Sequence, residues 1–248
     1  MLAIIGGSRL GQLAGLEVER RERTGTPYGD PSGPLVFGRL AGRDLVFLAR
    51  HGSDHGIPPH RVNYRANVWA VSQVGAARAI LAVAAVGGIR ADLHPGDLVL
   101  PDQIIDYTWG RPSTYHEGPG STVTHVDFSQ PYDAELRRKA LSAAQALSLP
   151  CAGSAVYAAT QGPRLETAAE INRLERDGAD VVGMTAMPEA VLARELGVPY
   201  AAINVVANYA AGRGQPPRAI SLAEINAVLD GAMQRVLALI ERMLADND

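Results

Sequence analysis

The sequence predicts an α/β fold with a mostly parallel or mixed central sheet. Short apolar segments alternate along the chain with amphipathic segments, and this alternation is typical of buried strands connected by helices. A length of 248 residues suits one large α/β domain. Because the chain has no internal repeat and no linker, we interpret residues 1–248 as a single domain.

Composition narrows the class of protein. A hydrophobic content of 47% and a charged content of 20% are ordinary for a globular protein with a sizeable core. The net charge of -3 gives no sign of a nucleic-acid or membrane surface. Cys151 is the single cysteine, so no intrachain disulfide forms and a reducing compartment is favoured. The chain begins without a basic leader, and the apolar run 80–86 is too short to cross a bilayer. We therefore expect a cytoplasmic protein of enzyme size.

The first elements are a strand and a hairpin. Residues 2–5 form an apolar run that enters the glycine turn 6–8, which carries a hydroxyl but lacks the G-x-G-x-x-G spacing of dinucleotide sites. Residues 35–40 and 44–48 flank a short Ala-Gly-Arg turn and predict a β-hairpin.

The hairpin ends in Arg50 and His51, which His55 and His60 follow. The three histidines could suggest a metal site, but their segment is a Gly/Pro loop and only Asp54 offers a nearby carboxylate. An Arg-His pair at a strand end is better interpreted as an anion clamp, because a guanidinium presents a fork of donors. The alternative for His51 is a hydrogen-bonded loop histidine.

The middle of the chain continues the alternation. Residues 61–70 have helical spacing and predict a helix that ends before Gly75. Residues 79–86 predict a buried strand closed by Gly87 and Gly88, where backbone N–H groups could approach a ligand. Residues 95–101 predict a turn and a short strand.

A long polar connection, residues 106–131, separates the two halves. A loop of this length in a compact domain is usually functional or part of an interface. Beyond it we predict a helix over 133–147, a strand over 155–160, and a helix over 167–176 that opens with a capping box. A buried strand over 200–206 and a long Ser-capped helix over 221–245 complete the chain.

The segment 178–192 is the most informative. Its apolar strand breaks at Gly183, and Pro188 with Glu189 suits the first turn of a helix that runs to about residue 196. Met184 and Thr185 therefore lie where a strand passes into a helix, the place where open α/β sheets bind ligands. A threonine hydroxyl and free backbone N–H groups suit an anion, and a methionine suits a flat or sugar-like group.

Eight short motifs together identify a family. They are IGGS (5–8), LARHG (48–52), PHRVNYRAN (59–67), VGG (86–88), PGD (95–97), QGPR (161–164), GMT (183–185) and MPE (187–189). With these motifs the chain resembles the trimeric purine nucleoside phosphorylases over nearly its whole length, and most closely their methylthioadenosine phosphorylase branch. The resemblance implies the nucleoside phosphorylase fold, a mixed and partly barrel-like β-sheet flanked by helices. It also implies a homotrimer, possibly arranged as a dimer of trimers.

The resemblance implies phosphorolysis as the reaction. Inorganic phosphate is the co-substrate that attacks C1′ of a nucleoside, and the purine leaves through a transition state that resembles a ribosyl cation. Positioning and electrostatics supply most of the acceleration of such a reaction. We therefore expect no metal, no organic cofactor and no protein nucleophile, and small-molecule partners rather than nucleic acid or membrane.

The resemblance also implies site residues. Phosphate is expected to contact Ser8, Arg50, His51, Thr185 and the backbone near Ala84 and Ala85. The family often has Thr or Asn where this chain has Ala84, so one side-chain donor is missing. Met184 is expected to pack under the ribose. His125 is expected to reach the 5′ substituent across a subunit interface.

The base-reading positions depart from the methylthioadenosine branch. That branch has Asp where this chain has Asn208 and again where it has Ala210, and a small polar residue in place of Glu166. The pair Glu166 and Asn208 looks instead like the 6-oxopurine nucleoside phosphorylases. We expect Leu165 and Ala210 to complete the base pocket, and Asn208, Thr185 and Ser8 to be the catalytic residues.

Hydrogen-bond chemistry makes the same distinction between bases. Hypoxanthine presents an N1–H donor that Glu166 can accept, and a 6-carbonyl to which the Asn208 amide can donate. The Asn208 carbonyl can also accept the proton on N7 in the transition state. Adenine reverses this edge, and a buried unpaired polar group costs roughly 1–3 kcal/mol, or about 10- to 100-fold in discrimination. The alternatives are a solvated acid at Glu166 and a strand-end turn residue at Asn208.

The sugar side indicates a methylthio group. Leu222 and Ile225 share one helix face at i and i+3, and they align with apolar residues that surround the 5′-methylthio group in the methylthioadenosine branch. Enzymes that use inosine tend to place a histidine in this region, and no histidine follows His125. Leu222 and Ile225 could alternatively be core residues.

Together these inferences predict phosphorolysis of S-methyl-5′-thioinosine to hypoxanthine and 5-methylthioribose 1-phosphate. The alternatives within the class are a general inosine/guanosine phosphorylase and a methylthioadenosine phosphorylase with an altered pocket. The alternative from another class is a non-catalytic purine-binding regulatory protein on the same fold.

Overall fold

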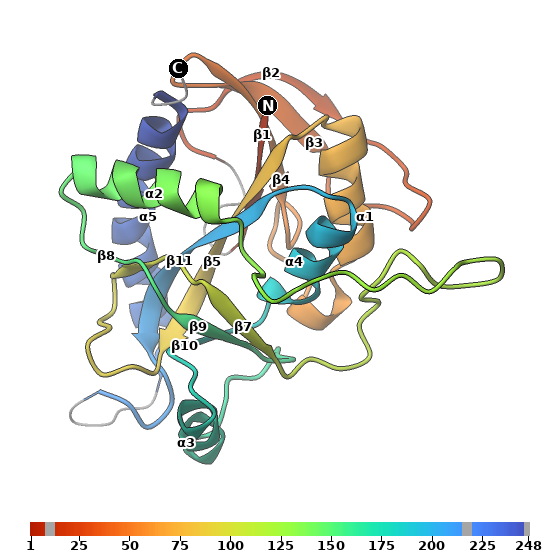
Figure 1. Cartoon of the computed structure of the whole chain (residues 1–248). Helices are drawn as coiled ribbons and strands as arrows, with labels where there is room; N and C mark the ends of the chain where they lie inside the picture. The colour runs from red at the N-terminus through yellow and green to blue at the C-terminus, as the bar shows by residue number, and fades with distance from the viewer. Residues whose placement is uncertain (8–12, 215–219, 246–248) are drawn as a thin grey trace.

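Two parallel ten-residue strands, β5 (Ala79–Gly88) and β11 (Tyr200–Tyr209), form the centre of the sheet (Figure 1). This computed structural model describes residues 1–7, 13–214 and 220–245. Both strands are almost entirely buried, which suits their near-continuous apolar sequence, because a strand covered on both faces has no polar side to present.

The described strands form one mixed sheet of eleven strands around this pair. On one side of β5, the parallel strands β1 (Leu2–Gly6) and β4 (Arg43–Ala49) lead to the antiparallel β3 (Leu35–Leu40) and the edge strand β2 (Glu17–Glu22).

Short strands extend the sheet at the other end of β5. The end of β5 pairs with β10, and β9 and β7 follow; β6 and β8 branch from β11. Their bounds are β6 Leu98–Val99, β7 Gln103–Asp106, β8 Cys151–Ala152, β9 Val156–Ala159 and β10 Val181–Gly183. No pairing between β7 and β8 closes the ring within the described residues, so the barrel is only partial.

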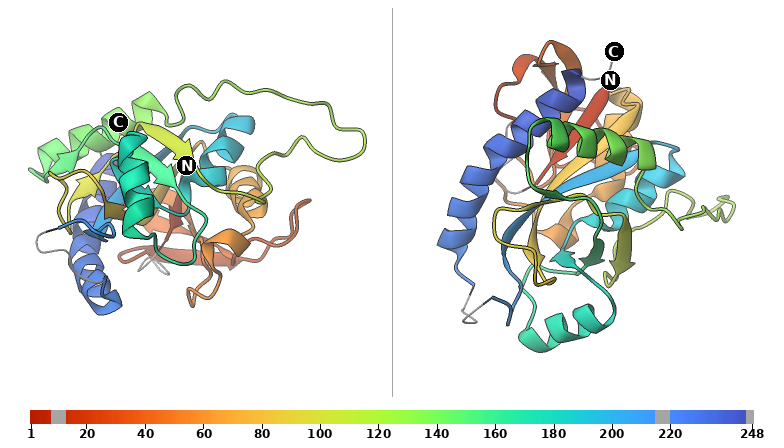
Figure 2. Two further views of the ribbon diagram at one scale, coloured as in Figure 1. Left: turned by 90° about the horizontal axis from the view of Figure 1, so that it is seen from below. Right: turned by 60° about the vertical axis from the view of Figure 1, so that its left-hand side comes forward.

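Helices cover both faces of the sheet. On one face, α1 (Tyr64–Trp69) and α4 (Ala186–Glu195) pack on a core that includes Val46 and Val86. On the other face, α2 (Ala134–Ala146) and α5 (Leu222–Ala245) pack side by side (Figures 1 and 2).

The remaining helical segments are short. A 3₁₀ turn over Pro59–Arg61 precedes α1, and a π-helical stretch over Ala70–Val74 continues it. The helix α3 (Ala168–Arg176) packs at the lower end of the molecule against Val182 and Ala210 (Figure 1). Within the described part of the chain, no helix is both long and apolar enough to cross a membrane.

The structure confirms the predicted single-domain mixed α/β fold and most of its elements. Strands β2 and β7 were not predicted, because the Glu17–Glu22 sequence is almost wholly charged and exposed and β7 is only half-buried. Helix α4 includes Met187 in an extended conformation (φ -116°, ψ 135°), so its continuous part begins at Pro188, as predicted.

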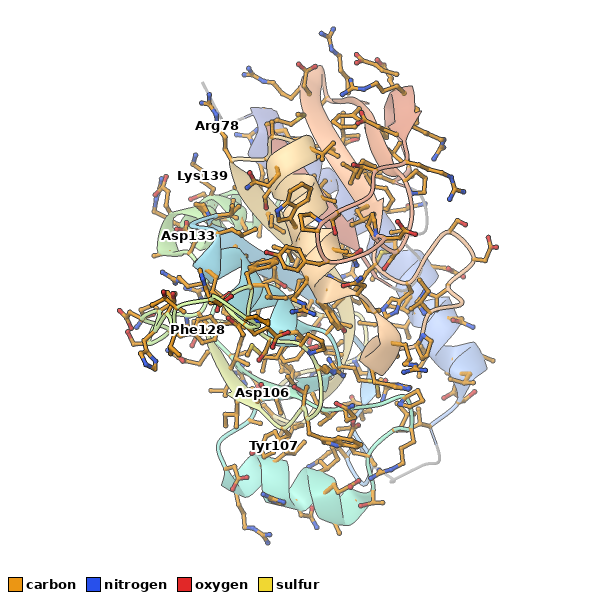
Figure 3. All side chains as sticks on the ribbon, turned by 90° about the vertical axis from the view of Figure 1, so that its right-hand side faces the viewer. Arg78, Asp106, Tyr107, Phe128, Asp133 and Lys139 are labelled. Atoms are coloured by element: carbon orange, nitrogen blue, oxygen red, sulfur yellow. The ribbon has the colours of Figure 1, made fainter. Side chains whose placement is uncertain are left out.

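The connection between β7 and α2 contains neither helix nor strand and projects from the body of the molecule (Figures 1 and 2). Its first residue, Tyr107, lies close to α3, where its hydroxyl donates to Asp177 Oδ2 at 2.6 Å (Figure 3). Phe128, at the far end, packs against the core.

The predicted capping box of α3 is present. The Thr167 hydroxyl accepts a hydrogen bond from the Glu170 N–H at 3.1 Å, and the Glu170 carboxylate accepts one from the Thr167 N–H at 2.7 Å. Both contacts satisfy N–H groups that the first helical turn leaves without a partner.

We predict that Thr167→Ala lowers the free energy of unfolding by about 1 kcal/mol, the usual effect of removing an N-cap side chain. Denaturant unfolding monitored by circular dichroism measures the change. Thr124→Ala, in the exposed connection between β7 and α2, is the matched control and should alter stability little. Equal effects of the two substitutions would contradict the capping role.

Candidate active site

A cavity of about 380 Å³ opens at the carboxyl ends of β4, β5 and β11. Ligands bind at this edge in open α/β sheets, because the strand ends and the following loops converge there. Twelve of the predicted site residues line the cavity: Arg50, His51, Ala84, Ala85, Leu165, Glu166, Met184, Thr185, Asn208, Ala210, Leu222 and Ile225.

Two further residues were predicted for the site. Ser8 lies outside the described residues. His125 is exposed on the projecting connection between β7 and α2 and is not part of the cavity wall of its own chain.

Arg50 forms part of the cavity wall and is held there by a buried ion pair. Arg50 Nε donates to Glu189 Oε2 at 2.6 Å and Arg50 Nη2 donates to Oε1 at 2.8 Å, with both side chains almost fully buried. The Tyr200 hydroxyl donates to the same carboxylate at 2.8 Å. Burial alone would lower the pKa of Arg50, but the Glu189 carboxylate outweighs burial and raises it, so the guanidinium stays charged.

The predicted anion clamp at Arg50 needs a correction. Arg50 also donates to the carbonyl oxygens of Val83 at 3.1 Å and Ile5 at 3.2 Å. Four of its five N–H donors are thus engaged by the protein, which leaves at most one Nη1 donor for an anion. The guanidinium fork holds Glu189, so Arg50 could offer an anion no more than one N–H donor.

His51 is held as a neutral side chain. Its Nδ1 lies 2.8 Å from the carbonyl oxygen of Ile57, and its ring lies 4.6 Å from that of His55. A carbonyl only accepts, so Nδ1 carries the proton and Nε2 presents a lone pair in the neutral ring. Burial and the neighbouring Arg50 charge lower the pKa of His51 to about 4.

Thr185 occupies the junction of β10 and α4. It is the N-cap of α4, it is 8% exposed, and its hydroxyl makes no capping hydrogen bond. Its N–H donates to the Tyr157 hydroxyl at 3.3 Å. A Cβ added at Gly183 would lie 2.1 Å from that hydroxyl, so only glycine leaves room for the Tyr157 side chain at this position.

Glu166 and Asn208 line the same cavity. The Thr160 hydroxyl donates to Glu166 Oε1 at 2.8 Å. The pairing of β11 with β5 shifts between Val206 and Asn208, and this bulge turns the end of β11 toward the cavity. Asn208 Nδ2 donates to the Tyr209 carbonyl at 2.7 Å, which uses one of its two N–H donors. One N–H and the amide oxygen can serve a ligand.

Apolar side chains line the rest of the cavity. Met184 Sδ lies against Gly162, where an added Cβ would come within 2.4 Å. Leu222 and Ile225 lie at the start of α5, and Leu222 is 71% exposed although it lines the cavity.

Sequence analysis missed several residues that support the site. Glu189 was interpreted as a first-turn acid, whereas it is the buried partner of Arg50. Its apolar surroundings over residues 186–192 were the available signal, because a fully buried acid usually has a cationic partner. Tyr200, Tyr157 and Thr160 gave no comparable signal, since the partner of each hydroxyl is set by the fold and follows no sequence pattern.

No three His, Cys, Asp or Glu side chains lie close enough to hold a metal ion within residues 1–7, 13–214 and 220–245. The side-chain donors and acceptors around the cavity include a guanidinium, two imidazoles (His51 and His55), a hydroxyl, a carboxylate and an amide. This set can bind an oxyanion at one end and a hydrogen-bonding heterocycle at the other.

Comparisons with known proteins agree with this arrangement. The Phosphorylase superfamily profile matches residues 1–245. A relative from Xanthomonas campestris pv. campestris, described as a probable S-methyl-5′-thioinosine phosphorylase, is 51% identical, over 96% of this chain and 95% of its own. A 6-oxopurine nucleoside phosphorylase from Pyrococcus furiosus is 47% identical, over 85% of this chain and 80% of its own.

A solved structure gives the same result for the fold. The methylthioadenosine phosphorylase from Schistosoma mansoni in complex with adenine has a TM-score of 0.93 and is 30% identical, over 98% of this chain and 90% of its own. The chain therefore belongs to the phosphorylase superfamily, and within it to the purine nucleoside phosphorylase type of pentosyltransferase.

We predict that Glu189→Gln lowers the free energy of unfolding by about 3–5 kcal/mol, because it leaves the buried Arg50 charge without its partner. Chemical denaturation measures this change. The matched control is Glu135→Gln, which breaks an exposed pair with Arg138 and should change stability by less than about 1 kcal/mol. Similar losses in the two variants would contradict the role given to the buried pair.

His51 should make stability depend on pH. The folded protein keeps His51 neutral down to about pH 4, whereas the unfolded chain protonates it near 6.5. Unfolding therefore takes up a proton between these values, and the free energy of unfolding falls as pH falls, by up to roughly 3 kcal/mol. We predict that His51→Asn flattens this dependence between pH 4 and 6.5, whereas His116→Asn, in the exposed connection, does not.

Proposed function

We propose that this protein catalyses the phosphorolysis of S-methyl-5′-thioinosine to hypoxanthine and 5-methylthioribose 1-phosphate. One observation carries the proposal: a single cavity combines an anion-binding end at Arg50 and Thr185, a base-reading pair at Glu166 and Asn208, and an apolar start of α5. The relative described as a probable S-methyl-5′-thioinosine phosphorylase supports the same substrate.

In this mechanism the protein binds and orients phosphate. The Thr185 hydroxyl and the remaining Nη1 donor of Arg50 donate to it, and the neutral His51 can accept the proton of a monoprotonated phosphate oxygen. We propose that Ser8 and the backbone at Ala84 and Ala85 complete this site. A fixed guanidinium needs no reorganisation as charge moves during the reaction.

The chemical step is a displacement at C1′. A phosphate oxygen forms a bond to C1′ while the C1′–N9 bond breaks, and the electron pair of that bond leaves with the purine. The leaving base takes up one proton from water at N7, and the Asn208 amide oxygen accepts a hydrogen bond from this N7–H. The protein supplies no covalent intermediate, so its work is positioning and electrostatic stabilisation.

Base choice is proposed to depend on Glu166 and Asn208. The Thr160 hydroxyl donates to Glu166 Oε1, and the carboxylate remains an acceptor for N1–H of a 6-oxopurine. A 6-aminopurine would place the N1 lone pair against this acceptor. Leu165, 40% exposed, and Ala210, buried, line the remainder of the base pocket.

The 5′ end is proposed to be apolar and shared between subunits. Met184 packs against the sugar, and Leu222 and Ile225 contact the methylthio group. We propose that the protein is a homotrimer, in which His125 of a neighbouring copy covers this end, since Leu222 is exposed in the single chain. The free Cys151 supports a cytoplasmic location.

A general inosine/guanosine phosphorylase is the second candidate. The 47% identical relative described as a 6-oxopurine nucleoside phosphorylase favours it, because Glu166 and Asn208 serve both substrates equally. Only the residues at the 5′ end separate the two candidates. A methylthioadenosine phosphorylase and a non-catalytic purine-binding protein remain as further outcomes of the test.

The decisive experiment compares kcat/KM for methylthioinosine, methylthioadenosine, inosine and adenosine at saturating phosphate. We expect methylthioinosine to be preferred over methylthioadenosine by about 10- to 100-fold or more, because adenine leaves polar groups unpaired. A preference for methylthioadenosine would refute the base assignment, and a preference for inosine would refute the apolar 5′ pocket. Release of no base would indicate the non-catalytic protein.

We predict that Asn208→Asp reduces the preference for methylthioinosine over methylthioadenosine. The substituted carboxylate can accept from a 6-amino group but cannot donate to a 6-carbonyl, so we expect kcat/KM for methylthioinosine to fall and that for methylthioadenosine to rise. Asn172→Asp is the matched control, because Asn172 lies on α3 and accepts from Arg213 outside the cavity. An unchanged ratio in the Asn208 variant would show that this residue does not select the base.

A further inference from the structure

Arg111, in the connection between β7 and α2, makes an extensive set of hydrogen bonds that the proposed mechanism does not use. Its guanidinium donates to Met184 O (2.8 Å), Met187 O (2.6 Å), Gln161 O (2.8 Å), Thr160 O (3.2 Å), Gln161 Oε1 (3.2 Å) and Tyr64 Oη (3.4 Å). Every one of these acceptors is uncharged. Arg111 itself does not line the cavity of the described residues.

The backbone acceptors belong to two neighbouring segments, one after β9 and one after β10, which are paired strands. Met184 and Met187 flank Thr185 at the junction of β10 and α4, on the side proposed for phosphate and sugar. Thr160 and Gln161 follow β9 on the base side, and Thr160 is the residue that donates to Glu166. The Thr160 N–H donates to the Gly183 carbonyl at 2.8 Å and joins the two strand ends, and the Arg111 guanidinium adds a second link between the segments that follow them.

The local backbone explains why these carbonyls need an external donor. Met187 is extended where α4 begins, so its carbonyl points out of the regular helical pattern. Half-buried carbonyls without partners are costly, and a planar group with five N–H donors can satisfy several at once. Lysine offers three donors from a single point and cannot span the same acceptors.

We propose that Arg111 is a positioning residue that fixes the phosphate and base halves of the site relative to each other. The identity of the ligands rests on the proposed function. The positioning role itself rests on the hydrogen bonds of the Arg111 guanidinium. Without the guanidinium, the two segments beyond the joined ends of β9 and β10 lose their second link and can shift relative to each other. Attack on C1′ requires both substrates to be placed to within a fraction of an ångström, so catalysis falls although no ligand contact is removed.

The test compares Arg111→Met and Arg111→Lys with the control Arg138→Met. This control removes an exposed arginine whose ion pair, among the described residues, is with its helix neighbour Glu135. For each variant, kcat/KM is measured on whichever nucleoside of the panel the wild type uses best, together with the selectivity between the 6-oxo and 6-amino substrates. The rise in melting temperature caused by phosphate and by hypoxanthine is measured in parallel, because it reports binding without turnover.

We expect Arg111→Met to lower kcat/KM by about 10- to 100-fold and to narrow the selectivity, with smaller thermal shifts for both ligands. Arg111→Lys should keep most of the melting temperature and recover only part of kcat/KM. Arg138→Met should match the wild type. If Arg111→Met does not fold, Arg111→Lys serves as the test variant. Its rises in melting temperature with phosphate and with hypoxanthine should still be smaller than those of the wild type.

A purely structural role would give a different result. In that case melting temperature would fall, but selectivity and ligand-induced thermal shifts in the folded variant would equal those of the wild type, and the inference would be overturned. Failure of the proposed function is separate, because it appears in the wild type alone as a different preferred nucleoside or as no turnover. In that event, the ligand-induced rises in melting temperature of the variants still test the role of Arg111.

Discussion

The buried ion pair between Arg50 and Glu189 is the constraint around which the site is built. The two residues are 139 positions apart, and their contact joins the end of β4 to α4, with Tyr200 of β11 as a third member. A charge taken out of water must be paired and hydrogen-bonded, so this network fixes the relative positions of three elements. Part of the wall of the cavity is therefore set by the interior of the protein and not by the ligand.

Departures from regular secondary structure collect around this network. The bulge before Asn208, the extended Met187 within α4 and the close approach of Tyr157 to Gly183 all lie beside the cavity. Regular strands would leave side chains alternating above and below the sheet. Each irregularity instead redirects a side chain or a backbone group toward one space, which is how a largely apolar sheet edge acquires a polar set of donors and acceptors.

The two ends of the cavity rest on different kinds of support. At the anion end, a buried charge and the N-cap residue Thr185 are held by core contacts. At the base end, Glu166 depends on a single hydroxyl from Thr160, and Asn208 is half-buried. Arg111 connects the two ends from a segment that is otherwise irregular. The proposed anion end is thus held by core contacts, whereas the proposed base end is held by local hydrogen bonds.

The amino-acid sequence by itself determined the alternation of strands and helices and the α3 capping box, because periodicity and capping are local properties. Its short motifs, through the family resemblance, also indicated twelve of the residues that line the cavity. It did not determine what Arg50 binds, since a guanidinium at a strand end looks the same whether it faces a ligand or Glu189. It also did not indicate strand β2, the close contact between Tyr157 and Gly183, or the hydrogen bonds from Arg111 to four backbone carbonyls. These depend on contacts between segments distant in the chain, and only the tertiary structure brings such segments together.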